Sequence, residues 1–129
     1  KGDHRQAEEA LVREKLRFCS FAPSVWTSAY TQEGITKLFG LIDSSRANRT
    51  RRISVKDLRA WYTAAVHRFP ASSLAAAKHI TQAEGIPPTF VIFTRQSARV
   101  TASQLRGLEN SLRSLFAFEG TPVRFVLKS

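Results

Sequence analysis

Apolar residues recur at helical spacing in two stretches of the first fifty residues, and a shorter apolar run lies between them. The spacing predicts one helix over 6–19, whose charged residues face outward, and another over 35–46. Pro23 ends the first helix, the apolar run at 24–27 predicts a strand, and 29–34 is a predicted loop. Strand, loop and helix in this order are typical of the end of a parallel α/β sheet.

Two further helices are predicted in the rest of the chain, each with a capping signal at its start. Ser54, with Asp57 three residues later, resembles a capping box and begins a predicted helix over 54–69, which Pro70 follows. Thr101 and Gln104 form a complete capping box at the start of the last helix. Apolar residues at helical spacing continue that helix as far as residue 116.

Three strands are predicted around these helices. The stretch 74–84 is a weak candidate, because its alanines have little β propensity. After a turn at 85–88, the near-continuous apolar run 89–93 predicts a central strand or one buried on both faces. A turn at 120–122 precedes 123–127, where apolar and polar residues alternate. Two helices packed on one face of this sheet would leave the other face, or an edge, for a partner.

The charge of the chain is strongly positive and unevenly distributed. Its 129 residues hold 20 Lys+Arg against 10 Asp+Glu, a formal net charge of +10. Residues 1–50 account for +2 and residues 51–129 for +8. This excess favours a polyanion as partner, because binding releases the counterions that phosphates condense. An anionic membrane would also attract the chain, but no apolar run approaches the length of a bilayer span.

Cysteine and methionine content add two expectations. The single cysteine, Cys19, excludes an intrachain disulfide and suits a reducing compartment. The chain contains no Met, and we therefore expect it to be a fragment, a processed product or part of a longer protein.

The basic residues of the second half are the main candidates for a binding role. Arginine outnumbers lysine, and its planar fork matches phosphate geometry better. The alternative is an ordinary solvated helix face, but acids do not balance the excess here. RNA binding is therefore favoured over that alternative, with these candidate contacts: Arg49, Arg51, Arg52, Lys56, Arg59, Arg68, Arg95, Arg99 and Arg106.

Catalytic and metal-binding signals are missing from the sequence. The three histidines, His4, His67 and His79, are scattered, and Cys19 lies on the apolar side of a predicted helix. The chain has no G-x-S-x-G elbow, no G-x-x-x-x-G-K-[ST] phosphate loop and no G-x-x-G clamp. We therefore predict no catalytic residues and no metal ligands, and we assign the aromatic residues to the core.

Several short motifs in the second half give the chain a family resemblance. They are PPTFVIF at 87–93, LEN at 108–110, FEGTPVR at 118–124 and RIS at 52–54. Their order and spacing resemble the C-terminal KH-like domain of the EngA/Der GTPases. The resemblance covers roughly the last three-fifths of the chain.

The first half resembles the end of the G domain that precedes the KH-like domain in that family. Thr27-Ser28-Ala29 resembles the Ser-Ala loop behind the guanine base, although Tyr30 departs from the usual pattern. Lys1-Gly2-Asp3 resembles the end of the Asn-Lys-x-Asp motif, in which an Asp carboxylate accepts both N–H donors of the guanine edge. The resemblance thus implies a guanine-binding set of Lys1, Asp3, Ser28 and Ala29.

The expected fold is α/β in two parts. Residues 1–46 would be the C-terminal part of a P-loop-type G domain, 47–53 a basic linker, and 54–129 an α+β KH-like RNA-binding domain of order α-β-β-α-β. The resemblance implies a GTPase that binds the large ribosomal subunit precursor and acts in ribosome biogenesis. Its partners would be large-subunit rRNA and ribosomal proteins or assembly factors, without a membrane.

The resemblance also sets expectations for ligands, alternatives and location. GTP or GDP with Mg would bind in the parent protein, whereas this chain alone, without a phosphate loop, should hold neither and should not hydrolyse GTP. A non-enzymatic ribosomal or RNA-binding protein with a KH-like domain is the alternative, and a protein-interaction module is a third. The bacterial cytoplasm and a mitochondrial or other organellar matrix both fit, and the arginine bias slightly favours an organelle.

Overall fold

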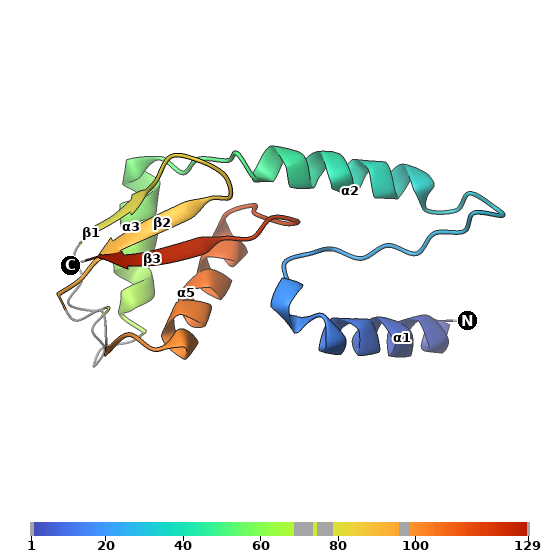
Figure 1. Ribbon diagram of the computed structural model, residues 1–129, viewed down its shortest axis with the longest axis horizontal. Coiled ribbons are helices and arrows are strands. Elements are labelled where there is room, and N and C mark those ends of the chain that lie inside the picture. The colour runs from blue at the N-terminus through green and yellow to red at the C-terminus, as the bar shows by residue number, and fades with distance from the viewer. Residues whose placement is uncertain (1, 69–73, 75–78, 96–98, 129) are drawn as a thin grey trace.

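The computed structural model describes residues 2–68, 74, 79–95 and 99–128, which form two halves joined end to end (Figure 1). The first half holds helix α1 (Gly2–Lys15), a 3-10 turn η1 (Arg17–Cys19) and helix α2 (Ile35–Asn48). The second half holds helix α3 (Val55–Val66), strands β1 (His79–Gln82) and β2 (Thr89–Phe93), helix α5 (Ala102–Leu115) and strand β3 (Arg124–Lys128). Figure 1 shows α3 and α5 together behind the sheet, and α1 and α2 extending away from it.

The three strands form one mixed sheet in the order β1-β2-β3. β1 runs antiparallel to β2, and β2 runs parallel to β3, with α5 in the connection between them. The predicted strands at 89–93 and 123–127 are confirmed to within a residue. β1 is shorter than the predicted stretch 74–84, of which residues 75–78 lie outside the described part of the chain.

The hydrophobic core belongs to the second half. Among the described residues, every buried hydrophobic side chain lies between Ile53 and Val123. Leu58 and Trp61 of α3 and Leu112 of α5 pack against the inward side chains of the strands. The central strand supplies Phe90, whose exposed fraction is 0%. The helices therefore cover one face of the sheet, as the sequence predicts, and leave the other open.

Capping residues fix where the two core helices begin. The Thr101 hydroxyl accepts a hydrogen bond from the Gln104 backbone N–H at 3.2 Å, and the Gln104 side chain accepts one from the Thr101 N–H at 3.0 Å. The predicted capping box is thus confirmed at α5. At α3 the Ser54 hydroxyl accepts from the Asp57 N–H at 3.1 Å. These bonds satisfy backbone donors that a helix start would otherwise leave unpaired.

A buried tyrosine also ties α3 to the following segment. The Tyr62 hydroxyl donates a hydrogen bond to the Leu74 carbonyl at 3.2 Å. Burial removes water from the phenol and raises the pKa of Tyr62 to about 12. Tyr62 therefore remains a neutral hydrogen-bond donor throughout the physiological pH range.

The first half departs from its predicted pattern in one respect. The strand predicted at 24–27 is wrong, because residues 23–28 form no β ladder. A strand needs a hydrogen-bonded neighbour, and the three described strands lie in the other half. The two helices are present, although α1 ends at Lys15 and α2 continues to Asn48. Asn48 is the one buried residue among the described residues of α2.

The two halves meet where the end of α2 contacts the turn before β3. The Asn48 side-chain amide donates to the Glu119 carbonyl at 3.0 Å, and the Gly120 N–H donates to the Phe21 carbonyl at 3.0 Å. Gly120 has a φ of +79°, and a Cβ at this position would collide with the Ser45 side chain. The contact therefore requires glycine both for its backbone angle and for the close approach.

Candidate nucleic-acid interface

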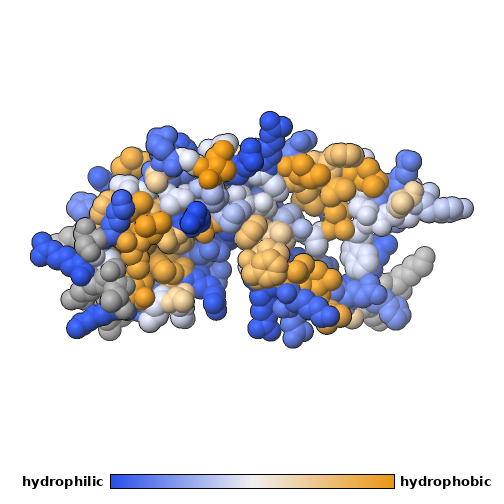
Figure 2. All heavy atoms as spheres, in the orientation of Figure 1, coloured by the Kyte–Doolittle hydropathy of each residue, from blue (hydrophilic) through white to orange (hydrophobic). Residues whose placement is uncertain are grey.

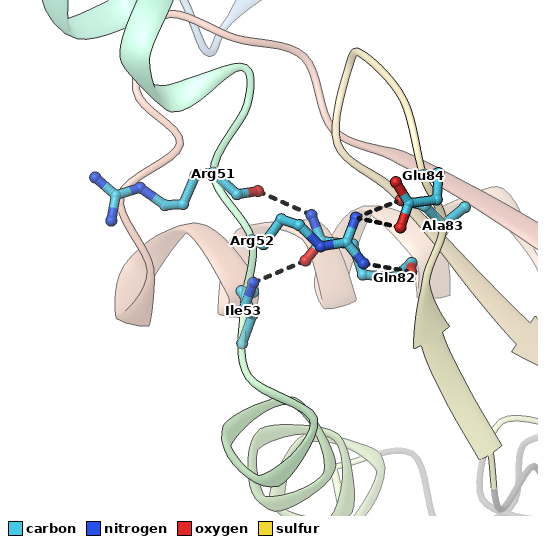
Figure 3. A network of polar contacts seen from close by, with 6 residues as sticks. All are labelled: Arg51, Arg52, Ile53, Gln82, Ala83 and Glu84. Carbon is cyan, nitrogen blue, oxygen red and sulfur yellow. Dashed lines mark hydrogen bonds and ion pairs between the residues drawn. The ribbon is translucent and has the colours of Figure 1, made fainter.

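Two cations in the predicted RNA-binding set are bound within the protein. Figure 3 shows Arg52 pointing at the end of β1, where its guanidinium donates to the carbonyls of Ala83 and Gln82 at 3.1 and 3.2 Å. Glu84 lies 3.9 Å from the same group. Arg51 donates to the Asn48 side-chain oxygen at 3.1 Å. Both arginines therefore have structural partners that the charge pattern alone does not reveal.

Gln82 completes this connection between the linker and the sheet. Its side-chain oxygen accepts from the Ile53 N–H at 2.8 Å, and its side-chain nitrogen donates to the Arg51 carbonyl at 2.8 Å (Figure 3). One glutamine thus pairs with the backbone on both sides of Arg52. Residues 51–53, which the sequence predicts as a linker, are fastened to the end of β1 by these bonds.

Arg113 has a similar structural role at the turn before β3, on the opposite edge of the same end of the sheet. It pairs with Glu109 at 3.2 Å and donates to the carbonyls of Phe118 and Thr121 at 2.9 and 3.0 Å. Its guanidinium also lies over the Phe21 ring, 5.3 Å from the centroid. Arg113 therefore neutralises one acid and holds the turn before β3, instead of presenting its charge to a partner.

The remaining basic candidates are available to a ligand. Their side chains are exposed and form no hydrogen bond or ion pair with any residue that the structure describes: Arg49, Lys56, Arg59, Arg68, Arg95, Arg99 and Arg106. Two of the four acids in this half, Glu84 and Glu109, are paired with Arg52 and Arg113. The pairing leaves most of the exposed positive charge without an ion pair among the described residues.

Helix α3 carries two of these cations on its outer side. Leu58, Trp61 and Tyr62 are buried against the sheet, so Lys56 and Arg59 lie on the outer side of the helix. The two cations are three residues apart and therefore neighbours on the helix surface. Spaced in this way they can contact successive phosphates of a nucleic acid backbone.

The open face of the sheet adds positions that the candidate set leaves out. Phe93 and Val126 are 40% and 36% exposed there, with Arg124 and Lys128 exposed on the edge strand. In Figure 2 hydrophobic atoms gather over the strands, with hydrophilic atoms around them. The alternation at 123–127 was the sequence signal for the side chains of β3, since every second residue of a strand points away from the core.

The guanine-binding candidates lie at the far end of the first half. Lys1 is outside the described residues, and Asp3 is in the first turn of α1, with its side chain also outside them. The Ser28 hydroxyl accepts from the Thr31 N–H at 3.2 Å, which shapes the loop that also contains Ala29. Arg5 of α1 lies 3.8 Å from Glu33 of that loop. The start of α1 and the Ser28–Ala29 loop are therefore neighbours, as a shared site would require.

The described residues contain neither a metal-binding cluster nor a membrane-spanning helix. Within them, no group of three His, Cys, Asp or Glu side chains is placed to hold a metal ion. No helix there is both long and apolar enough to cross a bilayer.

Replacing Arg52 with alanine is expected to destabilise the second half more than replacing Arg59. Arg52→Ala leaves the carbonyls of Gln82 and Ala83 without their donor and should lower the free energy of unfolding by about 1–2 kcal/mol. Arg59→Ala removes an exposed side chain and should cost less than about 0.5 kcal/mol. Urea denaturation of both variants measures the difference. Equal stability of the two variants would mean that the side-chain hydrogen bonds of Arg52 in Figure 3 contribute nothing.

Comparison with known proteins shows where the similarity lies. A family model described as the KH-domain-like domain of EngA bacterial GTPase enzymes, C-terminal, matches residues 52–128. The chain is 40% identical over 121 residues to GTPase Der of Pelotomaculum thermopropionicum, covering 91% of this chain and 28% of the relative. It is 33% identical over 133 aligned positions to GTPase Der of Streptococcus uberis, covering 99% of this chain and 30% of the relative.

These relatives are bacterial and much longer than this chain. A third, GTPase Der of Desulfitobacterium hafniense, is 34% identical over 124 residues, which are 93% of this chain and 28% of the relative. The chain thus spans less than a third of the length of each relative. The similarity runs through both halves, and the bacterial sources give no support to the organellar location that the arginine bias favours.

Proposed function

Because this chain belongs to the EngA/Der family of GTPases and carries their C-terminal KH-like domain, we propose that it docks such a GTPase on ribosomal RNA. The parent protein would bind the large ribosomal subunit precursor and act in ribosome biogenesis. The observation that carries the proposal is the exposed, unpaired positive charge around α3 and before α5, on a half-chain with a net charge of +8.

Docking would depend mainly on phosphates. Lys56, Arg59 and Arg68 have no partner within the described residues and can replace the counterions of an RNA backbone. Phosphate contacts carry little sequence information, and the G-x-x-G clamp on a nucleotide backbone is missing from the sequence. Specificity would therefore come from the shape of the folded RNA and from neighbouring ribosomal proteins.

In the parent protein, the first half would report the state of the bound nucleotide. The complete G domain of that protein would bind GTP or GDP with Mg, and Asp3 and the Ser28–Ala29 loop would contact the guanine base. Helix α2 leads from that loop to Asn48, which donates to the Glu119 carbonyl of the KH-like half. A shift of α2 on hydrolysis would reach the docking domain through this contact.

Binding to isolated ribosomal subunits tests the proposal. The purified chain should co-sediment with large subunits in preference to small subunits. Changing Lys56, Arg59 and Arg68 to Gln should remove most of the bound chain, because three unpaired cations are lost together. The matched control changes three exposed cations of the first half, Lys15, Lys37 and Arg46, to Gln and should bind normally. Equal binding to both subunits, or equal losses in the two variants, would contradict the proposal.

A further inference from the structure

A groove between the two halves has a chemistry that the phosphate-binding surface of α3 lacks. Its volume is about 870 Å³, and its walls come from the end of α1, η1, α5 and the approach to β3. Figure 2 shows the corresponding indentation between the two parts of the molecule. A volume in this range is typical of small-ligand sites, and it is sufficient for one or two nucleotides.

Positive charge lines the rim of this groove. Arg106 of α5 is exposed and has no partner among the described residues. Arg13 and Arg17 lie on the opposite wall, with side chains 55% and 80% exposed. Their partners are Glu9 at 3.2 Å and Glu14 at 3.9 Å. The longer and more exposed pair, Arg17 with Glu14, contributes little to stability and can exchange for a phosphate.

Two acids near the groove, Glu9 and Glu109, are already paired with arginines. Hydrogen bonds from Arg13 and Ser24 hold the pKa of Glu9 below its usual value, so this carboxylate is ionised and paired at neutral pH. Glu109 lies in the groove wall but is bound to Arg113 at 3.2 Å. A phosphate entering between Arg17 and Arg106 would therefore meet cations, without an unpaired carboxylate from these two residues.

An exposed aromatic ring completes the site. Phe18 lines the groove and is 80% exposed, so most of its ring is in contact with water. Phe21 and Phe125 form an apolar wall deeper in the groove. Unpaired nucleic acid bases stack on rings presented in this way, and the neighbouring arginines can contact the phosphates on either side.

We propose that the groove binds an unpaired stretch of RNA, with one base stacked on Phe18 and its flanking phosphates on Arg17 and Arg106. This inference rests on the proposed RNA docking and makes it more specific, because α3 contacts phosphates only, whereas the groove selects unpaired nucleotides. A base inside a duplex cannot offer its face to Phe18, since the neighbouring base pairs cover both of its faces.

Two RNAs that differ only in an unpaired end test the groove. The probes are a 20-base-pair RNA duplex and the same duplex with a single-stranded 3′ overhang of six nucleotides, compared by fluorescence anisotropy. The chain should bind the overhang RNA about 5- to 100-fold more tightly, as expected for one stacked base. Phe18→Ala should abolish this preference and leave duplex affinity unchanged, and Phe18→Trp should retain the preference.

The matched control is Tyr30→Ala, because Tyr30 is 98% exposed and lies outside the groove. It should keep the preference for the overhang. If the chain binds both RNAs equally well, or if Phe18→Ala prefers the overhang RNA as strongly as the unmodified chain does, the groove does not bind unpaired RNA. Either result would leave the proposed docking through α3 intact. An overhang preference that depends on Phe18, with no measurable duplex binding, would support the groove and count against the α3 surface.

Discussion

Phe90→Ala is expected to lower the free energy of unfolding of the second half by about 3–5 kcal/mol. Phe90 is 0% exposed at the centre of the sheet, and its ring lies 6.0 Å from that of Phe118 and 5.8 Å from that of Phe125. Removing the ring would leave a cavity between β2, β3 and the turn before β3, because a rigid sheet cannot collapse into the space. Urea denaturation followed by circular dichroism measures the loss.

Phe93→Ala is the matched control for this prediction. Phe93 is on the same strand but is 40% exposed on the open face of the sheet. Its removal leaves no cavity and should cost less than about 1 kcal/mol. Similar losses in both variants would contradict the assignment of the two faces. If Phe90→Ala does not fold, Phe90→Leu should still be less stable than Phe93→Leu.

The sequence predicted the second half well because local and long-range signals agree there. The run at 89–93 lies between turn residues, and Thr101 with Gln104 marks a helix start that the structure confirms. The motifs at 87–93 and 118–124 are in the order of the EngA/Der family, which the family model confirms over residues 52–128. Periodicity, capping and resemblance therefore lead independently to the same fold.

The strand predicted at 24–27 was wrong for a reason that the sequence cannot supply. Four apolar residues are compatible with a strand, but a ladder forms only where another strand lies alongside. In the described residues, Ser28 bonds to Glu33 within its own loop, and the sheet lies in the other half. The run at 24–27 has an apolar character that suits a strand, but whether it pairs with another strand depends on the tertiary structure.

The sequence also cannot show which arginines of the candidate RNA surface are free to bind RNA. A count of arginines cannot separate Arg52 from Arg59, although Arg52 donates to carbonyls 30 and 31 residues away and Arg59 is exposed without a described partner. Such partners become visible only when the chain has folded. The groove with Phe18 was missed for a related reason, because helical periodicity over 6–19 does not show which residues α5 faces. The guanine-binding residues remain a prediction.

The triple change of Lys56, Arg59 and Arg68 to Gln is expected to weaken RNA binding by roughly 100-fold or more at 0.1 M salt. Each lost phosphate contact should lower the slope of log affinity against log salt by about 0.7–0.9. Because these side chains have no described partner, the variant should retain the stability of the unmodified chain. Circular dichroism before the titration verifies that it is folded.

Phosphate docking through α3 is tested most directly by a salt titration of affinity for a structured large-subunit rRNA fragment. The unmodified chain, the triple variant and the control with Lys15, Lys37 and Arg46 changed to Gln are compared at equal temperature and pH. If these three cations contact phosphates, the slope should fall by about 2–3 in the triple variant and stay nearly unchanged in the control. Equal slopes in the unmodified chain and the triple variant would contradict phosphate docking through α3 and would make these cations an ordinary solvated surface.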